Sequence, residues 1–274
     1  MYLQRFLNKV LWVLGENMST NKKRIELLDE LRGFAILAMI VHHFFLDVGN
    51  VLDADWGYTV FDKLCILQPL FLAIFIIISG ICSQLSRSTI KRGAVVLGAG
   101  LAITLVTAVI MPRFGFKNVK IYFGILSCLG CCMIITGAIQ PLIDRVNTIV
   151  GMAVSGGLYL FFYNINNGSL CFGLIDLPKV KTNWLMPLGL YNDSFYSADY
   201  FSLLPWIFMF LFGAFIGKYA KAGAFPQWSY RRHSKALAFI GRNSLWVYLA
   251  HQVVIYTILY IFLGILKIYV KITM

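Results

Sequence analysis

The chain alternates between long apolar segments and short polar connections. A transmembrane helix needs about 20 predominantly apolar residues. Seven segments reach or approach this length: residues 30–49, 65–86, 93–112, 121–141, 147–163, 202–219 and 238–266. The fifth is the weakest, because it is short and contains Gly151, Gly156 and Gly157. The pattern predicts an all-α integral membrane protein with a single bundle of about seven transmembrane helices.

The basic residues between these segments predict the orientation of the bundle. Lysine and arginine are enriched in cytoplasmic loops. In a seven-helix bundle, the basic stretches 5–24, 87–92 and 218–235 fall on one side, whereas the 50–64 loop is acidic and suits the outside. The 113–120 loop, which contains three basic residues, argues mildly against this arrangement. We therefore predict a cytoplasmic N-terminus and an extracytoplasmic C-terminus.

Two segments outside the predicted spans have a distinct character. Residues 1–23 mix Arg5 and Lys9 with bulky apolar side chains, which predicts an interfacial N-terminal helix ahead of a transmembrane domain over residues 24–274. The long 164–201 connection is rich in aromatic residues and is too apolar for a flexible linker. It is expected to form a folded lid on the outer membrane surface.

Composition supports the membrane assignment. The chain is 59% hydrophobic and 13% charged, whereas soluble proteins contain about 25% charged residues. In a membrane protein, surplus lysine and arginine mostly reflect which loops are cytoplasmic. The net charge of +12 therefore does not imply nucleic acid as a partner. Of the six cysteines, Cys128, Cys131 and Cys132 share one helix but lack a second pair of ligands, so packing is the favoured interpretation and no metal site is predicted.

The first predicted helix carries polar residues along one face. Because an α-helix turns about 100° per residue, Asp29, Arg32, His43 and Asp47 share one stripe, and His42 points about 100° away. Ionisable residues inside a membrane usually face the interior of the bundle. His43 and Asp47 are one turn apart, so Asp47 is expected to orient His43 as a general base. The alternative is a pair that only holds helices together.

The last predicted helix and the residues before the sixth contain further polar candidates. Ser244, Tyr248 and His251 form a second stripe, for which the alternative is a hydrogen-bonded core histidine. Asp199 and Tyr200 precede Pro205, which suits a first helical turn, and the helix N-terminus would favour the Asp199 carboxylate. The alternative there is a plain helix cap.

A basic cluster follows the second predicted helix. Arg87, Lys91 and Arg92 could hold a phosphate-bearing ligand, although ordinary cytoplasmic charge is the better explanation for any one of them alone. The sequence contains no phosphate-binding Walker loop, no dinucleotide fingerprint and no HExxH or GxSxG motif, so these soluble-enzyme chemistries are not indicated.

Five blocks, taken in order, resemble the bacterial DUF1624 family, which is similar to the catalytic domain of heparan-alpha-glucosaminide N-acetyltransferase. The blocks are LLDELRGFAILAMIVHHFFLD, FIIISGICSQLSRSTIKRG, YFGILSCLG, DYFSLLPWIFMFLFGAFIGK and IGRNSLWVYLAHQ. The resemblance covers about residues 24–260. It implies a transmembrane acyltransferase that takes acetyl-CoA from the cytoplasm as donor co-substrate and meets its acceptor on the far side.

The acyltransferase function that the resemblance implies suggests a role for each candidate residue. His43, with Asp47, would be catalytic. Binding of the CoA phosphates and neighbouring donor atoms would fall to Arg32, Arg87, Lys91, Arg92, Arg242 and Ser244. Acceptor binding, or the lining of a tunnel, would fall to Asp199, Tyr200, Trp206, Tyr248 and His251. Expected partners are the lipid bilayer, acyl-CoA and an extracytoplasmic acceptor such as a glycan, with a homodimer left open. The location would be a bacterial plasma membrane.

Three positions depart from the family pattern. Ser127 stands where a histidine usually follows the FGIL block, and Val253 stands where proline usually follows HQ. The related lysosomal enzyme has an essential histidine in its first lumenal loop, and the nearest position here is Asp53. Transfer to an amino sugar is therefore not supported by the sequence, and His43 is the candidate to take over that role. The rival functions are a multi-pass transporter or channel, and a non-catalytic membrane scaffold.

Overall fold

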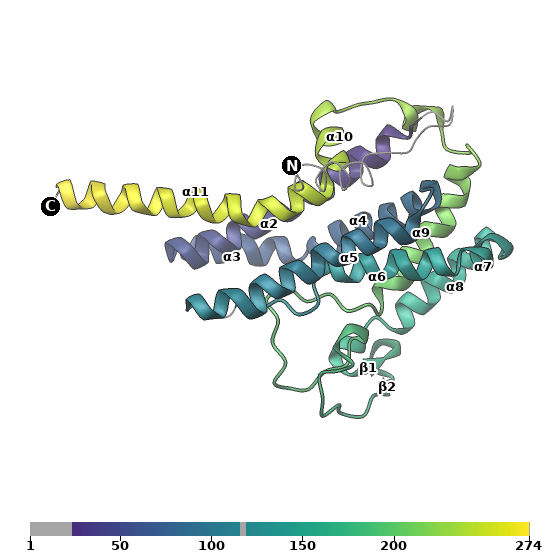
Figure 1. Cartoon of the computed structure of the whole chain (residues 1–274), viewed down its shortest axis with the longest axis horizontal. Coiled ribbons are helices and arrows are strands. Elements are labelled where there is room, and N and C mark those ends of the chain that lie inside the picture. The colour runs from purple at the N-terminus through teal and green to yellow at the C-terminus, as the bar shows by residue number, and fades with distance from the viewer. Residues whose placement is uncertain (1–23, 116–118, 274) are drawn as a thin grey trace, which may run out of the picture. The chain divides into compact units, whose positions relative to one another are not determined.

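The computed structural model describes residues 24–115 and 119–273 of the chain (Figure 1). Helices form most of this part, and its strands are the two-residue β1 Ser169–Leu170 and β2 Ile175–Asp176, which pair antiparallel. The prediction of an all-α protein is confirmed. The predicted interfacial helix over residues 1–23 lies outside the described residues.

Five helical stretches are long and apolar enough to cross a membrane. They are Glu26–Leu52 (α2), Gln68–Leu85 (α4), Thr89–Phe114 (α5 Thr89–Leu105, continued by short π- and 3₁₀-helical turns), Thr148–Asn167 (α8 Thr148–Phe161, continued by a 3₁₀ turn) and Ser244–Tyr269, within α11 Ser244–Thr273. Two other predicted spans correspond to shorter helices, α6 Ile125–Ala138 and α9 Trp206–Lys221. At about 1.5 Å per residue, these two cover about 21 and 24 Å, less than the roughly 30 Å hydrocarbon core.

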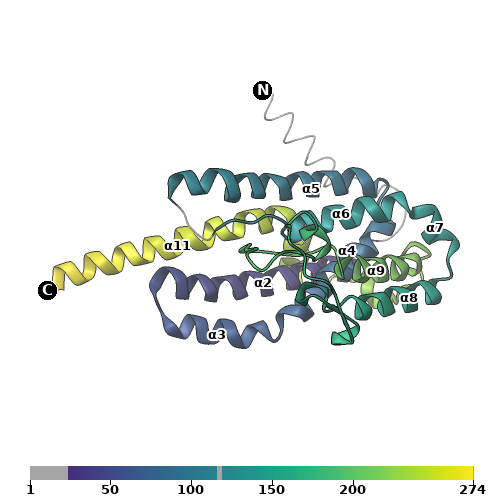
Figure 2. The same ribbon diagram turned by 90° about the horizontal axis from the view of Figure 1, so that it is seen from below.

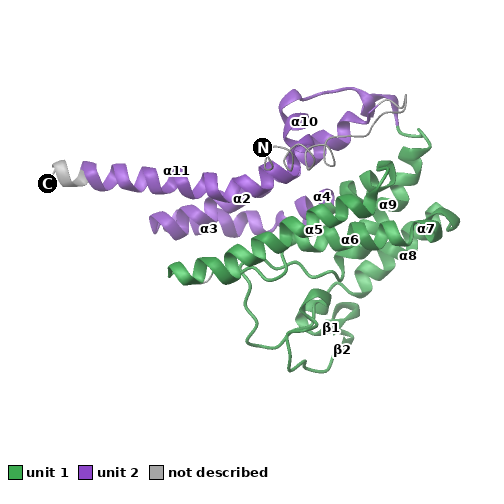
Figure 3. Ribbon diagram, in the orientation of Figure 1, with its two compact units in different colours: residues 1–22, 76–225 green, residues 23–75, 226–274 purple. Residues whose placement is uncertain are grey.

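The described residues fall into two compact units (Figure 3). The described part of unit 2 consists of residues 24–75 and 226–273, and that of unit 1 consists of residues 76–115 and 119–225. Unit 2 is therefore built from the two ends of the described chain, which the sequence does not reveal.

In unit 2, α2 is the central helix, and α3 Asp55–Cys65 and α11 pack against it (Figure 2). The short helix α10 Lys235–Arg242 also packs against α2. Arg242, next to the start of α11, contacts the start of α2, whereas Val48 near the end of α2 packs on Ile255 and Leu259. The helices α2 and α11 therefore run parallel. The span predicted over 238–266 corresponds to Ser244–Tyr269, and only its start differs: the backbone at Asn243 (φ −102°, ψ 22°) leaves the helical region and separates α10 from α11.

The chain turns sharply after α2 and folds back along it as α3. Asp53 adopts a left-handed conformation (φ 52°, ψ 42°) at the turn. Gly57 then approaches α2 so closely that a Cβ atom would lie 2.8 Å from the Gly49 nitrogen. The Tyr58 hydroxyl adds a 2.9 Å hydrogen bond to Asn50. This hairpin brings the end of α3 back to the middle of α2.

In unit 1, glycines allow the apolar helices to approach each other closely, as is common in membrane proteins. A Cβ on Gly130 of α6 would lie 2.5 Å from the Leu97 nitrogen of α5, and one on Gly213 of α9 would lie 2.2 Å from the Ile77 carbonyl oxygen of α4. Since lipid gives no hydrophobic drive for helix association, close packing of this kind is what holds such helices together.

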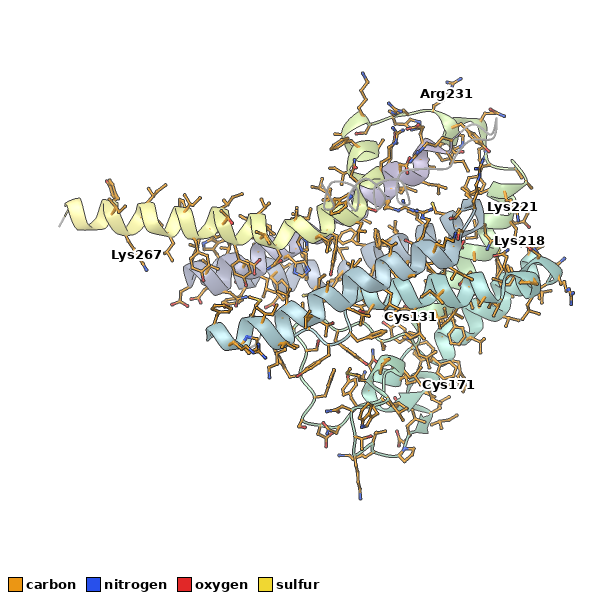
Figure 4. All side chains as sticks on the ribbon, in the orientation of Figure 1. Cys131, Cys171, Lys218, Lys221, Arg231 and Lys267 are labelled. Atoms are coloured by element: carbon orange, nitrogen blue, oxygen red, sulfur yellow. The ribbon has the colours of Figure 1, made fainter. Side chains whose placement is uncertain are left out.

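The ends of several unit 1 helices meet at one point. Lys218 near the end of α9 (labelled in Figure 4) donates hydrogen bonds to the carbonyl oxygens of Ile143 and Val146, at 3.0 and 2.7 Å. Ile143 lies in α7 Gln140–Arg145, the short helix after α6, and Val146 directly follows α7. Gln140 also exchanges two hydrogen bonds, at 2.9 and 2.8 Å, with Gln84 at the end of α4. The C-terminal ends of α4 and α9 therefore both lie against α7.

The segment between α8 and α9 is folded by its own aromatic contacts. The rings of Tyr191 and Phe195 lie 4.9 Å apart, and each lies 5.2 Å from the Tyr200 ring. The Tyr200 hydroxyl donates to the Met186 carbonyl oxygen at 2.5 Å. Burial raises the pKa of Tyr200 above its usual range, which keeps this donor protonated.

Candidate functional site

The start of α2 carries an acidic cluster that is paired with arginine. Glu26 accepts two 2.6 Å hydrogen bonds from Arg242 and one at 2.8 Å from Arg232. Asp29, which is 5% exposed, accepts from Arg24 at 2.6 Å and lies 3.4 Å from Arg242. We call these five residues, together with Glu30, the clasp. In it, buried carboxylates are compensated by cations, as stability requires.

Glu30 completes the clasp by capping α10. Its Oε1 atom accepts the backbone N–H groups of His233 and Ser234, at 2.6 and 2.9 Å. These groups precede the helix, and the Ser234 side chain accepts the N–H of Leu237 as the N-cap. A negative charge at a helix N-terminus is favourable. One carboxylate of α2 therefore fixes where α10 begins.

Two glycines let α10 and α2 touch within the clasp. A Cβ added to Gly241 would lie 1.8 Å from the Asp29 carbonyl oxygen, and one added to Gly33 would lie 2.1 Å from the Leu237 carbonyl oxygen. Neither distance is compatible with a side chain. The two residues stand in the sequence blocks LRG and IGRN, so at least part of these blocks encodes a helix crossing.

The clasp gives Arg242 a structural role. The predicted phosphate-binding guanidinium group is already held by Glu26 and Asp29. Arg32 and Ser244 also lie in unit 2, at the start of α2 and of α11. The other three predicted CoA-binding residues lie in unit 1: Arg87 between α4 and α5, and Lys91 and Arg92 in the first turn of α5. Arg87 and Lys91 are exposed.

The middle of α2 and the first turns of α11 bring three histidines together. The His43 ring lies 5.8 Å from that of His42 and 5.4 Å from that of His251. His42 is 6% exposed, and the other two are half-buried. We call these three residues the imidazole cluster. The sequence predicted His43 and His251 as separate site residues, and the parallel packing of α2 and α11 places them side by side.

Asp47 is held by α11. The carboxylate is 2% exposed and accepts a 2.7 Å hydrogen bond from the Gln252 side chain, with Tyr256 as a further hydrogen-bonding neighbour. The expected hydrogen bond from His43 to Asp47 is replaced by this contact in the structure, because α11 presents an amide donor at the same level. Gln252 was not predicted as a site residue.

The backbone orients His251. Its Nδ1 atom contacts the Tyr248 carbonyl oxygen, and its ring lies 5.2 Å from the Tyr248 ring. A carbonyl oxygen can only accept, so Nδ1 carries the proton. The Nε2 atom of a neutral imidazole is then a proton acceptor. His251 is thus prepared for proton transfer, whereas the sequence assigned it to acceptor binding.

A further contact was not expected from the sequence. The Cys65 thiol at the end of α3 lies 3.5 Å from Nε2 of His42, and the His42 ring lies 4.4 Å from the Phe61 ring. Cys65 was interpreted as a packing residue, and His42 as pointing away from the polar stripe. Only the α2–α3 hairpin brings the two residues together, and no sequence spacing signals it.

The remaining candidate residues lie in unit 1. The Asp199 carboxylate lies against Gly124, the residue that precedes α6: an added Cβ there would be 2.8 Å from Oδ2. Asp199 is therefore placed at the N-terminus of α6, whereas the sequence predicted that of α9. Trp206 begins α9 and its ring lies 5.7 Å from that of Tyr159. The predicted acceptor residues are thus divided between the two units, because Tyr248 and His251 belong to unit 2.

The chemistry that this arrangement offers is proton transfer by neutral imidazoles, with an adjacent thiol. Within residues 24–115 and 119–273, no group of three or more metal-ligating side chains is found. A histidine side chain held within hydrogen-bonding reach of the reacting group is the most common general acid or base.

Comparison with known proteins supplies the remaining context. The family model described as heparan-alpha-glucosaminide N-acetyltransferase, catalytic, matches residues 24–253. No curated protein and no solved structure matches the chain. The matched range contains the clasp, the imidazole cluster and Cys65.

Proposed function

The chain belongs to the heparan-alpha-glucosaminide N-acetyltransferase catalytic family, and from this premise we propose that it moves an acetyl or longer acyl group from cytoplasmic acyl-CoA to an extracytoplasmic acceptor. The family is one of membrane acetyltransferases, and the five apolar helices agree with it. The proposed acceptor group is a hydroxyl or an amine, for which a glycan is the expected carrier.

The observation that carries the proposal is the contact between His43 and His251, whose rings lie 5.4 Å apart on two apolar helices. Two neutral imidazoles can accept and return a proton without a net buried charge at rest. We propose that His43 removes the proton of the acceptor as it attacks the thioester carbonyl. The imidazolium of His43 shares its proton with Nε2 of His251. The bond between the carbonyl carbon and the CoA sulfur then breaks, and the departing CoA thiolate takes the proton from the imidazole pair.

For the donor, we propose that Arg87, Lys91 and Arg92 bind the CoA phosphates. Two of these side chains are exposed, and fixed cations of this kind suit phosphate. Arg242 is removed from the predicted set because the clasp occupies it, and Asp47 becomes a positioning residue of the α2–α11 interface.

We further propose seven crossings, a cytoplasmic N-terminus and a lid over residues 164–201. The helices α2 and α11 run parallel, so an odd number of crossings must lie between them. The long helices α4, α5 and α8 satisfy this, and so does the set that adds α6 and α9. The meeting of the ends of α4, α7 and α9 supports the larger set, because α6 and α9 then run in the same direction as α4. The proposed location is a plasma membrane.

Acetyl-CoA binding to the purified full chain in detergent tests the donor side. We expect binding by the wild type, weaker binding by Arg92→Ala, and unchanged binding by His43→Gln. Lys267→Ala on α11 (labelled in Figure 4) is the matched loss of a charge elsewhere. Absence of binding to the wild type at millimolar acetyl-CoA and at longer acyl-CoAs would leave the scaffold and transporter functions as the better explanations.

A further inference from the structure

The thiol of Cys65 lies against a histidine base. Its Sγ atom is 3.5 Å from Nε2 of His42, and Cys65 itself is half-buried, so part of the residue is accessible. Within the part of the chain that the structure describes, this is the one cysteine with an imidazole partner. A nucleophile within hydrogen-bond reach of a base is the general signature of covalent catalysis.

We propose that Cys65 is an acyl-carrying nucleophile and that His42 is its base, so that the chain transfers the acyl group in two steps through a thioester on Cys65. The inference rests on the proposed acyltransferase function and adds a site to it. Among the described residues, Cys65 is the only cysteine that the α2–α3 hairpin places beside the imidazole cluster. The inference gives this thiol a chemical role.

The surroundings of Cys65 explain why the thiol needs a base. Cys65 is the last residue of α3, where the partial negative charge of the helix terminus disfavours a thiolate, and Asp62 lies one turn earlier. The resting group is therefore the neutral thiol, which is a poor nucleophile. His42 can take its proton because Nε2 faces the sulfur, while contact with the Phe61 ring fixes the imidazole.

In the first step, the Cys65 S–H proton passes to His42 as the sulfur attacks the carbonyl carbon of the acyl-CoA. The bond between that carbon and the CoA sulfur breaks, and the departing CoA thiolate takes the proton from His42. The products are an acyl thioester on Cys65 and free CoA thiol. One thioester replaces another, so no oxidant, reductant or energy source is required.

In the second step, the acceptor hydroxyl or amine loses its proton to His43 and attacks the Cys65 thioester. The bond between the carbonyl carbon and the Cys65 sulfur breaks. The acceptor proton passes from His43 to His42, and His42 gives it to the Cys65 thiolate, so both imidazoles end neutral and the thiol is restored. The 5.8 Å separation of the two rings gives each step its own base on adjacent residues of α2. Acyl-CoA and acceptor would then never need to occupy the site together.

The test is to trap the intermediate on the full-length protein in detergent, using radiolabelled acetyl-CoA without any acceptor. Covalent label is measured after denaturation, and its position is found by mass spectrometry of peptides. The variants are Cys65→Ala, Cys65→Ser and His42→Gln, with Cys171→Ala (the loop cysteine labelled in Figure 4) as the matched cysteine control. The rate of thiol alkylation at Cys65 is followed in parallel, with and without His42.

We expect label on Cys65 in the wild type and in Cys171→Ala, released by neutral hydroxylamine as thioesters are, and none in Cys65→Ala. Cys65→Ser should carry a hydroxylamine-resistant ester or no label, and His42→Gln should slow both labelling and alkylation at least about tenfold.

The inference is overturned if Cys65→Ala releases CoA and transfers the acyl group at the wild-type rate, in which case the acyltransferase function stands and transfer is direct. It is also overturned if the label lies on a histidine. If the wild type neither binds acetyl-CoA nor releases CoA, the proposed function fails together with this inference.

Discussion

The clasp and the imidazole cluster are two polar groups on the same helix, and they differ in how their charges are satisfied. In the clasp, Glu26 and Asp29 are each held by arginines, and Glu30 caps a helix. In the imidazole cluster, His43 has two other imidazoles as its ring neighbours. Complete pairing stabilises a structure, because broken pairs leave buried charges. Neutral groups that can gain or lose a proton remain free to do chemistry.

The comparison also separates two kinds of information in the family blocks. LRG and IGRN supply the two glycines of the α2–α10 crossing and Arg242 of the clasp, whereas VHHFFLD and LAHQ supply the imidazole cluster together with Asp47 and Gln252. The first pair of blocks therefore sets the position of α10 against α2. The second pair sets the chemistry, and mutations should distinguish them.

The largest effect is expected for His43→Gln. Loss of a general base lowers the rate by about 100- to 10,000-fold, while glutamine keeps the polarity and approximate size of the side chain. Acyl transfer and thermal unfolding are measured together on the purified variant. His233→Gln is the control. His233 lies just before α10 and contacts Glu30, so this variant should retain activity. Normal activity of His43→Gln would remove the chemical role from the imidazole cluster.

The next effect is a loss of stability in Gly241→Ala. The added Cβ would lie 1.8 Å from the Asp29 carbonyl oxygen, so α10 must move, at a cost of about 3 kcal/mol in the free energy of unfolding. Gly264→Ala on α11 is the matched control, because its Cβ would meet nothing within 4 Å. Equal thermal stability of the two variants would show that the crossing is looser than described.

A smaller effect is expected for Arg242→Ala. The Arg242 side chain is 33% exposed, so loss of the contacts with Glu26 and Asp29 should cost only about 1–2 kcal/mol. Arg242→Lys should recover part of this, since a lysine cannot form the two-pronged contact. Acetyl-CoA affinity should stay near that of the wild type in both. A selective loss of affinity without loss of stability would return Arg242 to the donor site.

The smallest effect concerns Tyr200 in unit 1. Burial raises the pKa of Tyr200, so the folded state holds its proton more tightly than the unfolded state does. The stability from this group is complete below the unfolded value of about 10 and falls as the pH rises above it. Tyr200→Phe should lose about 1 kcal/mol with the Met186 hydrogen bond. It should also show a weaker alkaline decline in melting temperature than Tyr219→Phe, an exposed control.

The sequence was sufficient for features that depend on local pattern. Apolar segment lengths predicted the helical class, and the spacing of His43 and Asp47 placed both on α2. The sequence could not predict contacts made by residues far apart in the chain. The bond from Gln252 to Asp47 depends on the parallel packing of α11 on α2, and the contact of Cys65 with His42 depends on a hairpin after Asp53.

Errors in the predicted spans have a similar origin. Apolarity alone does not reveal that the backbone leaves the helix at Asn243, or that α6 has only 14 residues. Arg242 looked like a phosphate ligand because its partners Glu26 and Asp29 lie more than 200 residues away. A charged residue in an apolar chain therefore suggests a buried site. Which residue it contacts then decides whether its role is structural.

The most direct test of the account is release of CoA thiol from acetyl-CoA by the full-length protein, with water and a panel of sugars and amino sugars as acceptors. The wild type and the clasp variant Arg242→Lys should release CoA at similar rates, and His43→Gln should be slower by at least about 100-fold. Release that is unchanged in His43→Gln, or no release by the wild type with any acceptor, would contradict the assignment of acyl transfer to the imidazole cluster.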